Sequence, residues 1–532
     1  MWNTRNRLNG NCLSFVFVAI WVAVSFFLIG CSGKSPSITI EAPTLAAAPA
    51  GGSTAPPPTS TSPCASYLDG TDTRITGTES NGNCIYGTDF VSENKPLTTD
   101  VTIKDFSGVH IFQATLQVGI DRTSGEIPEG PTLTIEEGAT LAWTSAADYL
   151  LITRGSRLNA LGTQAAPITL TAYEDAVSNT AAPFATQLWG GVVINGKGIT
   201  NKCDDEQRSS HTCHIQSEGK PSHYGGSNNQ DSSGTLRYVV IKYPGFEVAP
   251  GDELNGLTLN AVGGATVVEN VQVYSAYDDG VEFFGGAVDV SNFIALYVRD
   301  DSIDYADGWV GSISNALVIH AEGDGNRCIE GDNQGSSHGA RPLTNPRVSN
   351  LTCITSGGSG GTHGDSEGIL LRRGVSSQLA NSIVYDGYGR NMLNTNGNEC
   401  LELDDSATRA NAQTGAMTIK STAIVCREAT KDSLPNGDSI AQWVLNNGSG
   451  SYPNNTDNLI WTMSDDADLA VVGGSKGYFT LPSFTDVNGV SVTVPSTNGV
   501  PIGAVSESND WTADWSVCLE PRAENVCGLW FL

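Results

Sequence analysis

Acidic side chains recur at equivalent positions of a sequence repeat, and together they have the chemistry of a cation site. The motif begins at Asn270 and again at Asn292, and acidic residues lie eight, nine and twelve residues after each of these asparagines. These residues are Asp278, Asp279, Glu282, Asp300, Asp301 and Asp304. Carboxylates of stacked units repel one another unless a cation intervenes, and Ca2+ takes about six to eight oxygen ligands. We therefore predict a Ca2+ site here; the alternative is a solvated acidic edge that keeps the units in register.

Aromatic residues stand beside these acids in the sequence. We predict that Tyr277, Tyr305 and Trp309 bind a ligand, because their ring faces can stack on sugar rings in a carbohydrate groove. Phe283 and Phe284 are successive residues of an expected strand, and such side chains point to opposite faces. One of these two phenylalanines is therefore expected to fill the interior.

A second group of candidate residues surrounds the glycine-rich segment at residues 357–364. It contains His338, His363, Asp365, Glu367, Arg372 and Arg373. Histidine and carboxylates together can hold a transition metal or exchange protons, but a long Gly/Ser insertion is more typical of a mobile loop, which is the interpretation we favour. The sequence has no nucleophile elbow, P-loop, HExxH or Rossmann signature, so it does not decide whether the protein is an enzyme.

One motif repeats through the middle of the chain and predicts the fold that positions these residues. An asparagine at a turn is followed by a short, mostly apolar strand, and the first three copies are 22 and 23 residues apart. The motif asparagines are Asn270, Asn292, Asn315, Asn350 and Asn381. Strands this closely spaced leave no room for a crossover helix but suit an all-β parallel β-helix, a solenoid with stacked coils and long loop insertions. A β-sandwich or propeller is the alternative, and neither explains the asparagine ladder.

Ten cysteines form five close pairs in sequence order once Cys12 and Cys31 are set aside. The pairs are Cys64/Cys84, Cys203/Cys213, Cys328/Cys353, Cys400/Cys426 and Cys518/Cys527. An even number in an exported chain predicts disulfides, and no pair has the C-x2-4-C spacing of a zinc site. The third and fourth pairs are separated by 25 and 26 residues, about one coil. We expect these two to staple adjacent coils, which lie about 4.8 Å apart.

The first residues have the order of a bacterial export signal. Arg5 and Arg7 precede an apolar run that ends in Leu-Ile-Gly before Cys31, which resembles the lipobox of lipoproteins. We predict a signal peptide at 1–30, lipidation of Cys31 and anchoring in the outer membrane, facing the cell surface; an uncleaved membrane anchor is the alternative. Residues 31–63, rich in Ala, Pro, Ser and Thr, are predicted to be a flexible linker.

The net charge argues against one class of partner. Removal of the predicted signal takes away Arg5 and Arg7 and leaves 26 basic and 57 acidic side chains, a net charge of −31. Nucleic acids require a cationic face for their phosphates, so we expect no nucleic-acid partner. Cations, cationic ligands and neutral sugars remain.

Several segments match a known pattern in order. They lie at residues 133–139, 151–156, 162–168, 189–196, 234–239, 253–259 and 278–286, and the last reads Asp-Asp-Gly-Val-Glu-Phe-Phe-Gly-Gly. The series resembles bacterial surface-exposed lipoproteins with a pectate-lyase-like β-helix, which are mostly uncharacterised and related to β-helix proteins that Bacteroidetes secrete by the type IX system. The resemblance implies a right-handed β-helix and surface exposure, and it brings no catalytic assignment.

The predicted domain order after the linker is an N-terminal cap region at 64–130, a β-helix at 131–445 and a C-terminal β-rich cap region at 446–532. Two functions fit these residues. The preferred one is a surface lipoprotein whose acidic β-helix binds a ligand, a polysaccharide or an outer-membrane partner such as a transporter, together with Ca2+. The alternative is a polysaccharide lyase or glycoside hydrolase of the pectate-lyase-like class, with Arg299 beside the acidic turn as the base of a lyase; fold alone does not decide between them.

Overall fold

The computed structural model describes residues 62–219, 222–356, 358, 361–387, 399–462, 471–485 and 489–519. The predicted signal peptide, the lipidation site Cys31, nearly all of the linker and Cys527 lie outside these residues. The chain divides into residues 1–59 and 60–532, and every described residue belongs to the second unit. Within the described ranges, no helix is long and apolar enough to span a membrane.

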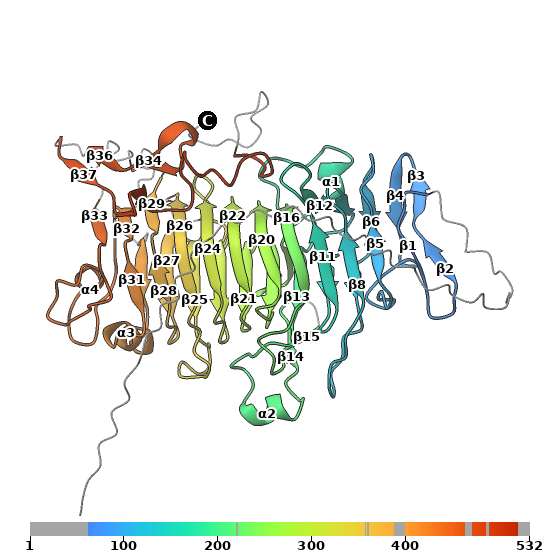
Figure 1. The fold of residues 1–532 in the computed structure, drawn as a ribbon, viewed down its shortest axis with the longest axis horizontal. Helices are drawn as coiled ribbons and strands as arrows, with labels where there is room; N and C mark the ends of the chain where they lie inside the picture. The colour runs from blue at the N-terminus through green and yellow to red at the C-terminus, as the bar shows by residue number, and fades with distance from the viewer. Residues whose placement is uncertain are drawn as a thin grey trace, which may run out of the picture. The chain divides into compact units, whose positions relative to one another are not determined.

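Most strands lie side by side in two long sheets (Figure 1). Sheet 1 consists of β7 (Leu116–Val118), β10 (Leu150–Ile152), β13 (Val192–Asn195), β19 (Leu257–Asn260), β21 (Val281–Phe284), β23 (Ile303–Ala306), β25 (Arg327–Asp332), β27 (Glu367–Arg372) and β30 (Leu401–Leu403). Sheet 2 consists of β3 (Thr78–Ser80), β4 (Asn83–Tyr86), β5 (Val101–Ile103), β6 (His110–Phe112), β8 (Thr132–Ile135), β9 (Thr140–Trp143), β11 (Arg157–Leu161), β12 (Ile168–Ala172), β16 (Gly234–Lys242), β20 (Val267–Tyr274), β22 (Asp289–Leu296), β24 (Ser312–Ile319), β26 (Arg347–Thr355), β28 (Gln378–Ala380), β29 (Ile383–Asp386), β31 (Thr418–Lys420), β32 (Ala423–Cys426) and β33 (Leu459–Thr462).

Short hairpins and helices belong to the connections between these strands and to the two ends. The hairpins are β1 (Ser66–Leu68) with β2 (Arg74–Thr76), β14 (Ile215–Gln216) with β15 (His223–Tyr224), β17 (Phe246–Ala249) with β18 (Asp252–Leu254), β34 (Val472–Gly473) with β35 (Phe479–Thr480), β36 (Ser483–Thr485) with β37 (Ser491–Thr493), and β38 (Ser496–Thr497) with β39 (Val500–Pro501). The helices are α1 (Tyr173–Ala176), α2 (Asp205–Ser209), α3 (Ser406–Gln413) and α4 (Ile440–Val444).

The strand register confirms the predicted parallel β-helix. Val271 on β20 pairs with Phe293 on β22, and Phe293 pairs with Ala316 on β24, so each coil advances by the 22 or 23 residues of the motif. Apolar side chains at these positions stack in the interior and form a continuous core. Parallel pairing starts with β4 and β6 and ends with β32 and β33, so it extends beyond the predicted range of 131–445 at both ends.

Four of the motif asparagines form the predicted ladder, whereas the amide oxygen of Asn381 accepts a hydrogen bond from the Thr497 hydroxyl at 2.7 Å. All five asparagines have a positive φ, between 52° and 59°, which bends the backbone within a strand or, at Asn381, between β28 and β29. The Asn315 Nδ2 donates to Asn292 Oδ1 at 2.9 Å and the Asn350 Nδ2 donates to Asn315 Oδ1 at 2.9 Å. Asparagine suits this place because it tolerates the left-handed conformation and its amide both donates and accepts.

Four of the predicted cysteine pairs are disulfide bonds. They are Cys64–Cys84, Cys203–Cys213, Cys328–Cys353 and Cys400–Cys426. Cys518 is also disulfide-bonded, whereas its predicted partner Cys527 lies outside the described residues.

The expectation that two of these bonds staple adjacent coils is wrong. Cys328 lies on β25 of sheet 1 and Cys353 on β26 of sheet 2, with 6.0 Å between their Cα atoms, so the bond crosses the interior and joins the two sheets. Cys400 and Cys426 likewise join the start of β30 to β32. The interval of 25 residues was misleading because it contains the loop at 333–346 and is not a full coil.

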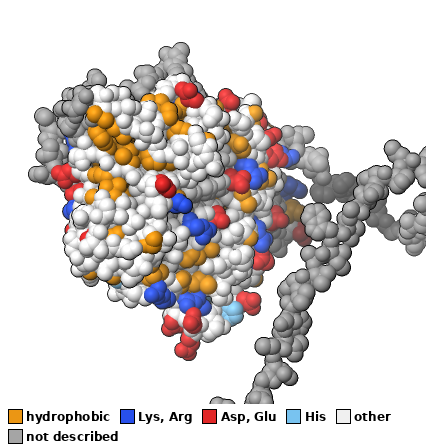
Figure 2. Space-filling model, turned by 60° about the vertical axis from the view of Figure 1, so that its left-hand side comes forward, with side chains coloured by type: hydrophobic (Ala, Val, Ile, Leu, Met, Phe, Trp, Pro, Cys, Tyr) orange, Lys and Arg blue, Asp and Glu red, His pale blue; other side chains and the backbone are white. Residues whose placement is uncertain are grey.

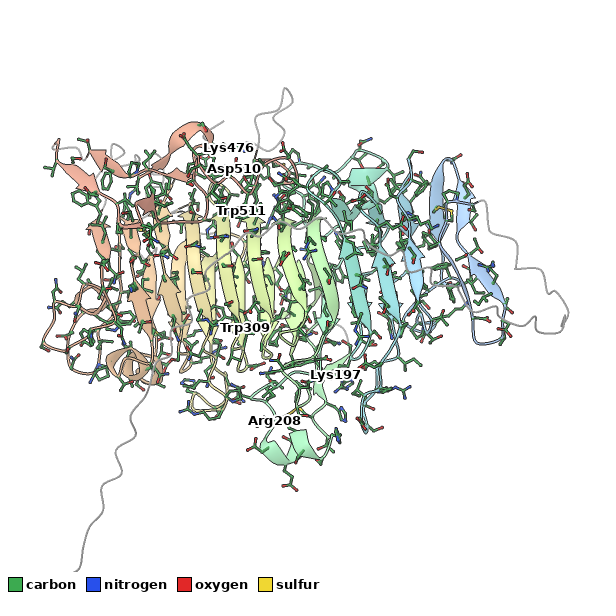
Figure 3. The ribbon with its side chains drawn as sticks, viewed as in Figure 1. Lys197, Arg208, Trp309, Lys476, Asp510 and Trp511 are labelled. Carbon is green, nitrogen blue, oxygen red and sulfur yellow. A yellow bond between two sulfur atoms is a disulfide. The ribbon has the colours of Figure 1, made fainter. Side chains whose placement is uncertain are left out.

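The segment at residues 489–519, here called the C-terminal strap, packs along the outside of sheet 2 and does not cover its end (Figure 3). The Ala504 N–H donates to Thr352 Oγ1 at 2.8 Å, and Gln272 exchanges two hydrogen bonds with the backbone of Val517 at 2.7 and 2.9 Å. Outward-facing apolar residues of sheet 2, such as Leu317 and Ile354, are buried beneath this C-terminal part of the chain.

The asparagine ladder gives a test of the fold. Asn315→Ala should lower the free energy of unfolding by about 2 to 4 kcal/mol, because it removes two hydrogen bonds and leaves an ordinary residue in the left-handed conformation. Asn315→Gly should be less destabilising by about 1 kcal/mol, because glycine adopts this conformation without steric cost. Equal stability of the two variants in chemical denaturation would contradict this account of the bend.

Candidate metal centre

The acidic residues gather on the outer face of sheet 1, where the two-residue period of the strands places them. On β21, Val281 and Phe283 face the core, and Glu282 between them faces outward. The register pairs Glu282 with Asp304 on β23, and Asp304 with Glu330 on β25. Parallel stacking therefore brings three carboxylates of consecutive coils into one row.

The turns before β21 and β23 add a second row, which keeps the coils in register. The Asp279 carboxylate accepts a hydrogen bond from the Asp301 N–H at 3.0 Å, and the Asp301 carboxylate accepts one from the Arg327 N–H at 2.9 Å. Asn255 continues the series, because its Oδ1 accepts from the Asp279 N–H at 3.2 Å. Asp279 and Asp301 are only 6% and 5% exposed, so this row aligns the coils as the alternative prediction held, but it is not solvated.

Within these rows, carboxylate oxygens approach one another closely enough to share a metal ion. In each of four groups, the candidate ligand atoms all lie within 4.8 Å of one another. The groups are Asp279/Glu282/Asp304, Asp279/Asp300/Asp301, Asp301/Asp304/Glu330 and Asp278/Asp300/His363. The Oδ1 atom of Asp304 is buried and accepts no hydrogen bond from the described part of the chain. The first group contains only oxygen donors, which fits a hard cation such as Ca2+.

Basic side chains compensate only part of this charge. Arg327 and Arg372 both form ion pairs with Glu330. Within the described ranges, no Lys, Arg or His forms an ion pair with Asp279, Glu282 or Asp304. Burial and then the repulsion of neighbouring carboxylates raise the pKa of each of these three groups well above its usual range. Without a cation, burial and mutual repulsion therefore favour the protonated form of these carboxyls.

His363 completes the edge of the site from the loop that precedes β27. Its Nδ1 lies 3.1 Å from Asp300 Oδ2, and its ring meets the Tyr277 ring edge-on with 4.9 Å between centroids. Burial alone would lower the pKa of His363, but the hydrogen bond and negative charge of Asp300 outweigh it and raise the pKa. The sequence favoured a mobile loop here, and the structure instead brings this histidine to the predicted acids.

The other members of the second predicted group do not converge on one site. His338 faces Asp405 at 3.5 Å, Glu367 pairs with Arg327 at 3.1 Å, and Arg373 pairs with Asp332. The pair formed by His338 is separate, whereas Glu367, Arg372 and Arg373 belong to one ion-pair network on sheet 1 that Arg327, Glu330 and Asp332 connect.

Comparison with known proteins agrees with this architecture. A family model described as a pectate-lyase-like beta helix domain matches residues 122–463. The chain belongs to this family. No curated protein and no solved structure matches the chain.

In this pectate-lyase-like chain, two of the three predicted ligand-binding aromatics are core residues. Tyr305 is 1% exposed and Trp309 is fully buried, with its ring stacked on Phe283 at 4.0 Å between centroids. Tyr305 alternates with Asp304 along β23 and must therefore point inward when the carboxylate points outward. These two residues cannot stack on a ligand, whereas Tyr277 lies at the edge of the site beside His363. Phe283 fills the interior as one of the two phenylalanines was expected to do, and Phe284 lies near Lys202.

The sequence did not identify Glu218 and Glu330 as members of the site. Glu330 lies fifteen residues after Asn315 instead of twelve, because the turn before β25 is three residues longer than in the two preceding coils. Glu218 comes from the β14–β15 insertion, and its side chain forms a hydrogen bond with the side chain of Glu282. Neither residue lies at the spacing of the repeat.

The face of the described chain shown in Figure 2 has Lys and Arg side chains scattered among Asp and Glu. No continuous basic surface is visible on this face.

The raised pKa values of Asp279, Glu282 and Asp304 give a pH prediction. In EDTA the native protein should bind more protons than the unfolded chain above about pH 4, so these groups should make the free energy of unfolding fall as pH rises toward neutrality. Glu282→Gln/Asp304→Asn should remove much of this dependence and be more stable than wild type at pH 7. Parallel stability curves for the two proteins between pH 4 and 7 would contradict the assignment.

Proposed function

We propose that this protein is a Ca2+-dependent binding protein, with the ion held by Asp279, Glu282 and Asp304. The observation that supports this is the convergence of these three carboxylates within 4.8 Å, without an ion-pair partner in the described part of the chain. One Asp279 oxygen and one Glu282 oxygen already accept hydrogen bonds, from the Asp301 N–H and from the Asn255 amide. Glu218 also hydrogen-bonds to Glu282, whereas the Oδ1 of Asp304 has no hydrogen-bond partner in the described part of the chain and is available to an ion.

The donor set favours Ca2+ over other divalent ions. All three side chains supply oxygen, and they come from β21, from β23 and from the turn before β21. Mg2+ requires a nearly ideal octahedron, whereas Ca2+ accepts irregular coordination by about six to eight oxygens. Three carboxylates leave coordination positions open, so the bound ion would accept hydroxyl or carboxylate oxygens from a ligand. We propose a polysaccharide as this ligand, with an outer-membrane transporter as the alternative partner.

The proposed location is the outer membrane, with the protein held there by lipid on Cys31 and facing the cell surface. The support is the order of the first residues: basic start, apolar run, lipobox-like segment and polar linker. A lipid anchor and a long linker would let a polymer-binding solenoid act at the cell surface without a membrane-spanning segment.

A glycoside hydrolase is the second candidate, and one observation favours it. Carboxylate oxygens of Asp304 and Glu330 lie within 4.8 Å of each other. Arg327 and Arg372 form ion pairs with Glu330 but not with Asp304. Burial raises the pKa of both carboxyls, but Arg372 and Arg327 offset part of this rise for Glu330, and a retaining hydrolase uses two unequal carboxyls about 5 to 5.5 Å apart. A lyase has less support, because Arg299, its expected base, faces Asp324 at 3.6 Å.

Calcium binding is tested by the melting temperature. CaCl2 at about a hundred times its dissociation constant should stabilise wild type by about 2.7 kcal/mol relative to EDTA. Glu282→Gln/Asp304→Asn should lose this response. Glu136→Gln/Glu137→Gln is the matched control: it removes the same charge from residues outside the site and should keep the response. Identical melting of wild type in EDTA and in millimolar CaCl2 would rule out the calcium site.

The anchor is tested separately by Cys31→Ser. The variant should accumulate as an unprocessed precursor without lipid, whereas wild type should begin at an acylated Cys31. Mass spectrometry of the purified N-terminus distinguishes them. A wild-type N-terminus elsewhere, with no acyl group on Cys31, would show that the segment is not a lipobox.

A further inference from the structure

A pocket outside the metal centre lies where three coil turns meet the loop after α1. Its volume is about 370 Å3, and its principal lining residues are Phe184, Ser275, Tyr297, Arg299, Glu322 and Asp324. Ser275, Tyr297 and the two acids follow β20, β22 and β24, and Phe184 comes from the loop between α1 and β13. The carboxylates of the metal centre do not line this pocket.

Phe184 is exposed to an unusual degree for an aromatic residue of this protein. It is 42% exposed, and the other exposed large hydrophobic residues in the described part of the chain are all aliphatic. Its position is fixed: its ring packs against Tyr297 at 5.1 Å, Arg299 donates to its carbonyl at 2.9 Å, and the Tyr274 hydroxyl bonds to the preceding carbonyl of Pro183. A fixed, exposed ring that lines a pocket provides a flat apolar surface, and a ligand can bind it without a further loss of side-chain conformational entropy.

The rest of the pocket lining includes charged side chains with a net negative charge. Arg299 lies 3.6 Å from Asp324, which offsets its charge, and Glu322 is exposed beside them. Asp324 is oriented by hydrogen bonds from the Thr362 N–H at 2.8 Å and hydroxyl at 3.1 Å. Two carboxylates and one guanidinium offer several donors and acceptors but repel an anionic ligand.

We propose that this pocket binds one uncharged pyranose unit of a polysaccharide. The CH face of the sugar stacks on Phe184, and its hydroxyl groups bond to Arg299, Glu322 and Asp324. The flat apolar face of a sugar matches Phe184, and its hydroxyl groups match the charged lining residues. The pocket volume also suits a ligand of this small size. This inference names the ligand class of the binding protein proposed above, but it does not require the calcium site.

The test is calorimetric titration with neutral oligosaccharides of glucose, mannose and xylose and with matched oligomers of galacturonate and mannuronate. Wild type should bind at least one neutral oligomer, and more tightly than any uronate. Phe184→Ala should weaken that binding at least about tenfold, and Phe184→Leu should also weaken it because leucine has no flat face. Leu161→Ala removes another exposed apolar side chain, on β11, and should bind like wild type.

Three outcomes would overturn the sugar site: no binding of any oligomer by wild type, a preference for uronates, or equal affinity of Phe184→Ala and wild type. The calcium proposal is tested by a separate measurement, the melting temperature. Phe184→Ala should keep the calcium-induced rise in melting temperature, and Glu282→Gln/Asp304→Asn should still bind the neutral oligomer in EDTA. A calcium response without sugar binding therefore removes only the pocket, and sugar binding without a calcium response removes only the metal site.

Discussion

Stacking of each coil directly on the previous one is the constraint on which the rest of this structure depends. Parallel pairing in register places equivalent residues of successive coils next to one another, so every side chain meets its own counterpart. For asparagine this is favourable, because each amide can donate to one neighbour and accept from the other, as Asn315 does. For carboxylates it is unfavourable, because an ionised acid offers only acceptors and a like charge.

The acidic rows on sheet 1 show how this repulsion is moderated. Asp279 and Asp301 each accept a hydrogen bond from a backbone N–H of the next coil. These carboxylates therefore join neighbouring coils, as the asparagines do. Glu330 has two arginine partners. Glu282 and Asp304 lack such partners within the described residues, and apolar outward-facing residues at these positions would avoid the cost of burying charge. The cost of burying these carboxylates is the physical basis of the metal site proposed above.

The repeat allowed the sequence to predict the coil length, the asparagine ladder and the meeting of the six acids, because each depends on local spacing. The repeat did not reveal which residues of the loop insertions lie next to these acids. His363 and Glu218 reach the acids from loops whose length has no fixed relation to the coil. Tyr305 and Trp309 were misplaced because adjacency to acids was given more weight than the strand period, which points Tyr305 inward whenever Asp304 points outward.

The two sheets also differ in what covers their outer faces. Sheet 2 presents Leu317 and Ile354 outward, and the C-terminal part of the chain buries them, so that face is occupied by the protein itself. An apolar segment could not cover the outer face of sheet 1 in the same way, because it would leave the carboxylates of Glu282 and Asp304 without water or partners. Polar groups of the chain pack there instead, because Asn255 and Glu218 of the β14–β15 insertion both hydrogen-bond to Glu282. The outer face of sheet 2 is therefore closed by apolar packing, whereas the outer face of sheet 1 carries the carboxylates on which the proposed metal site rests.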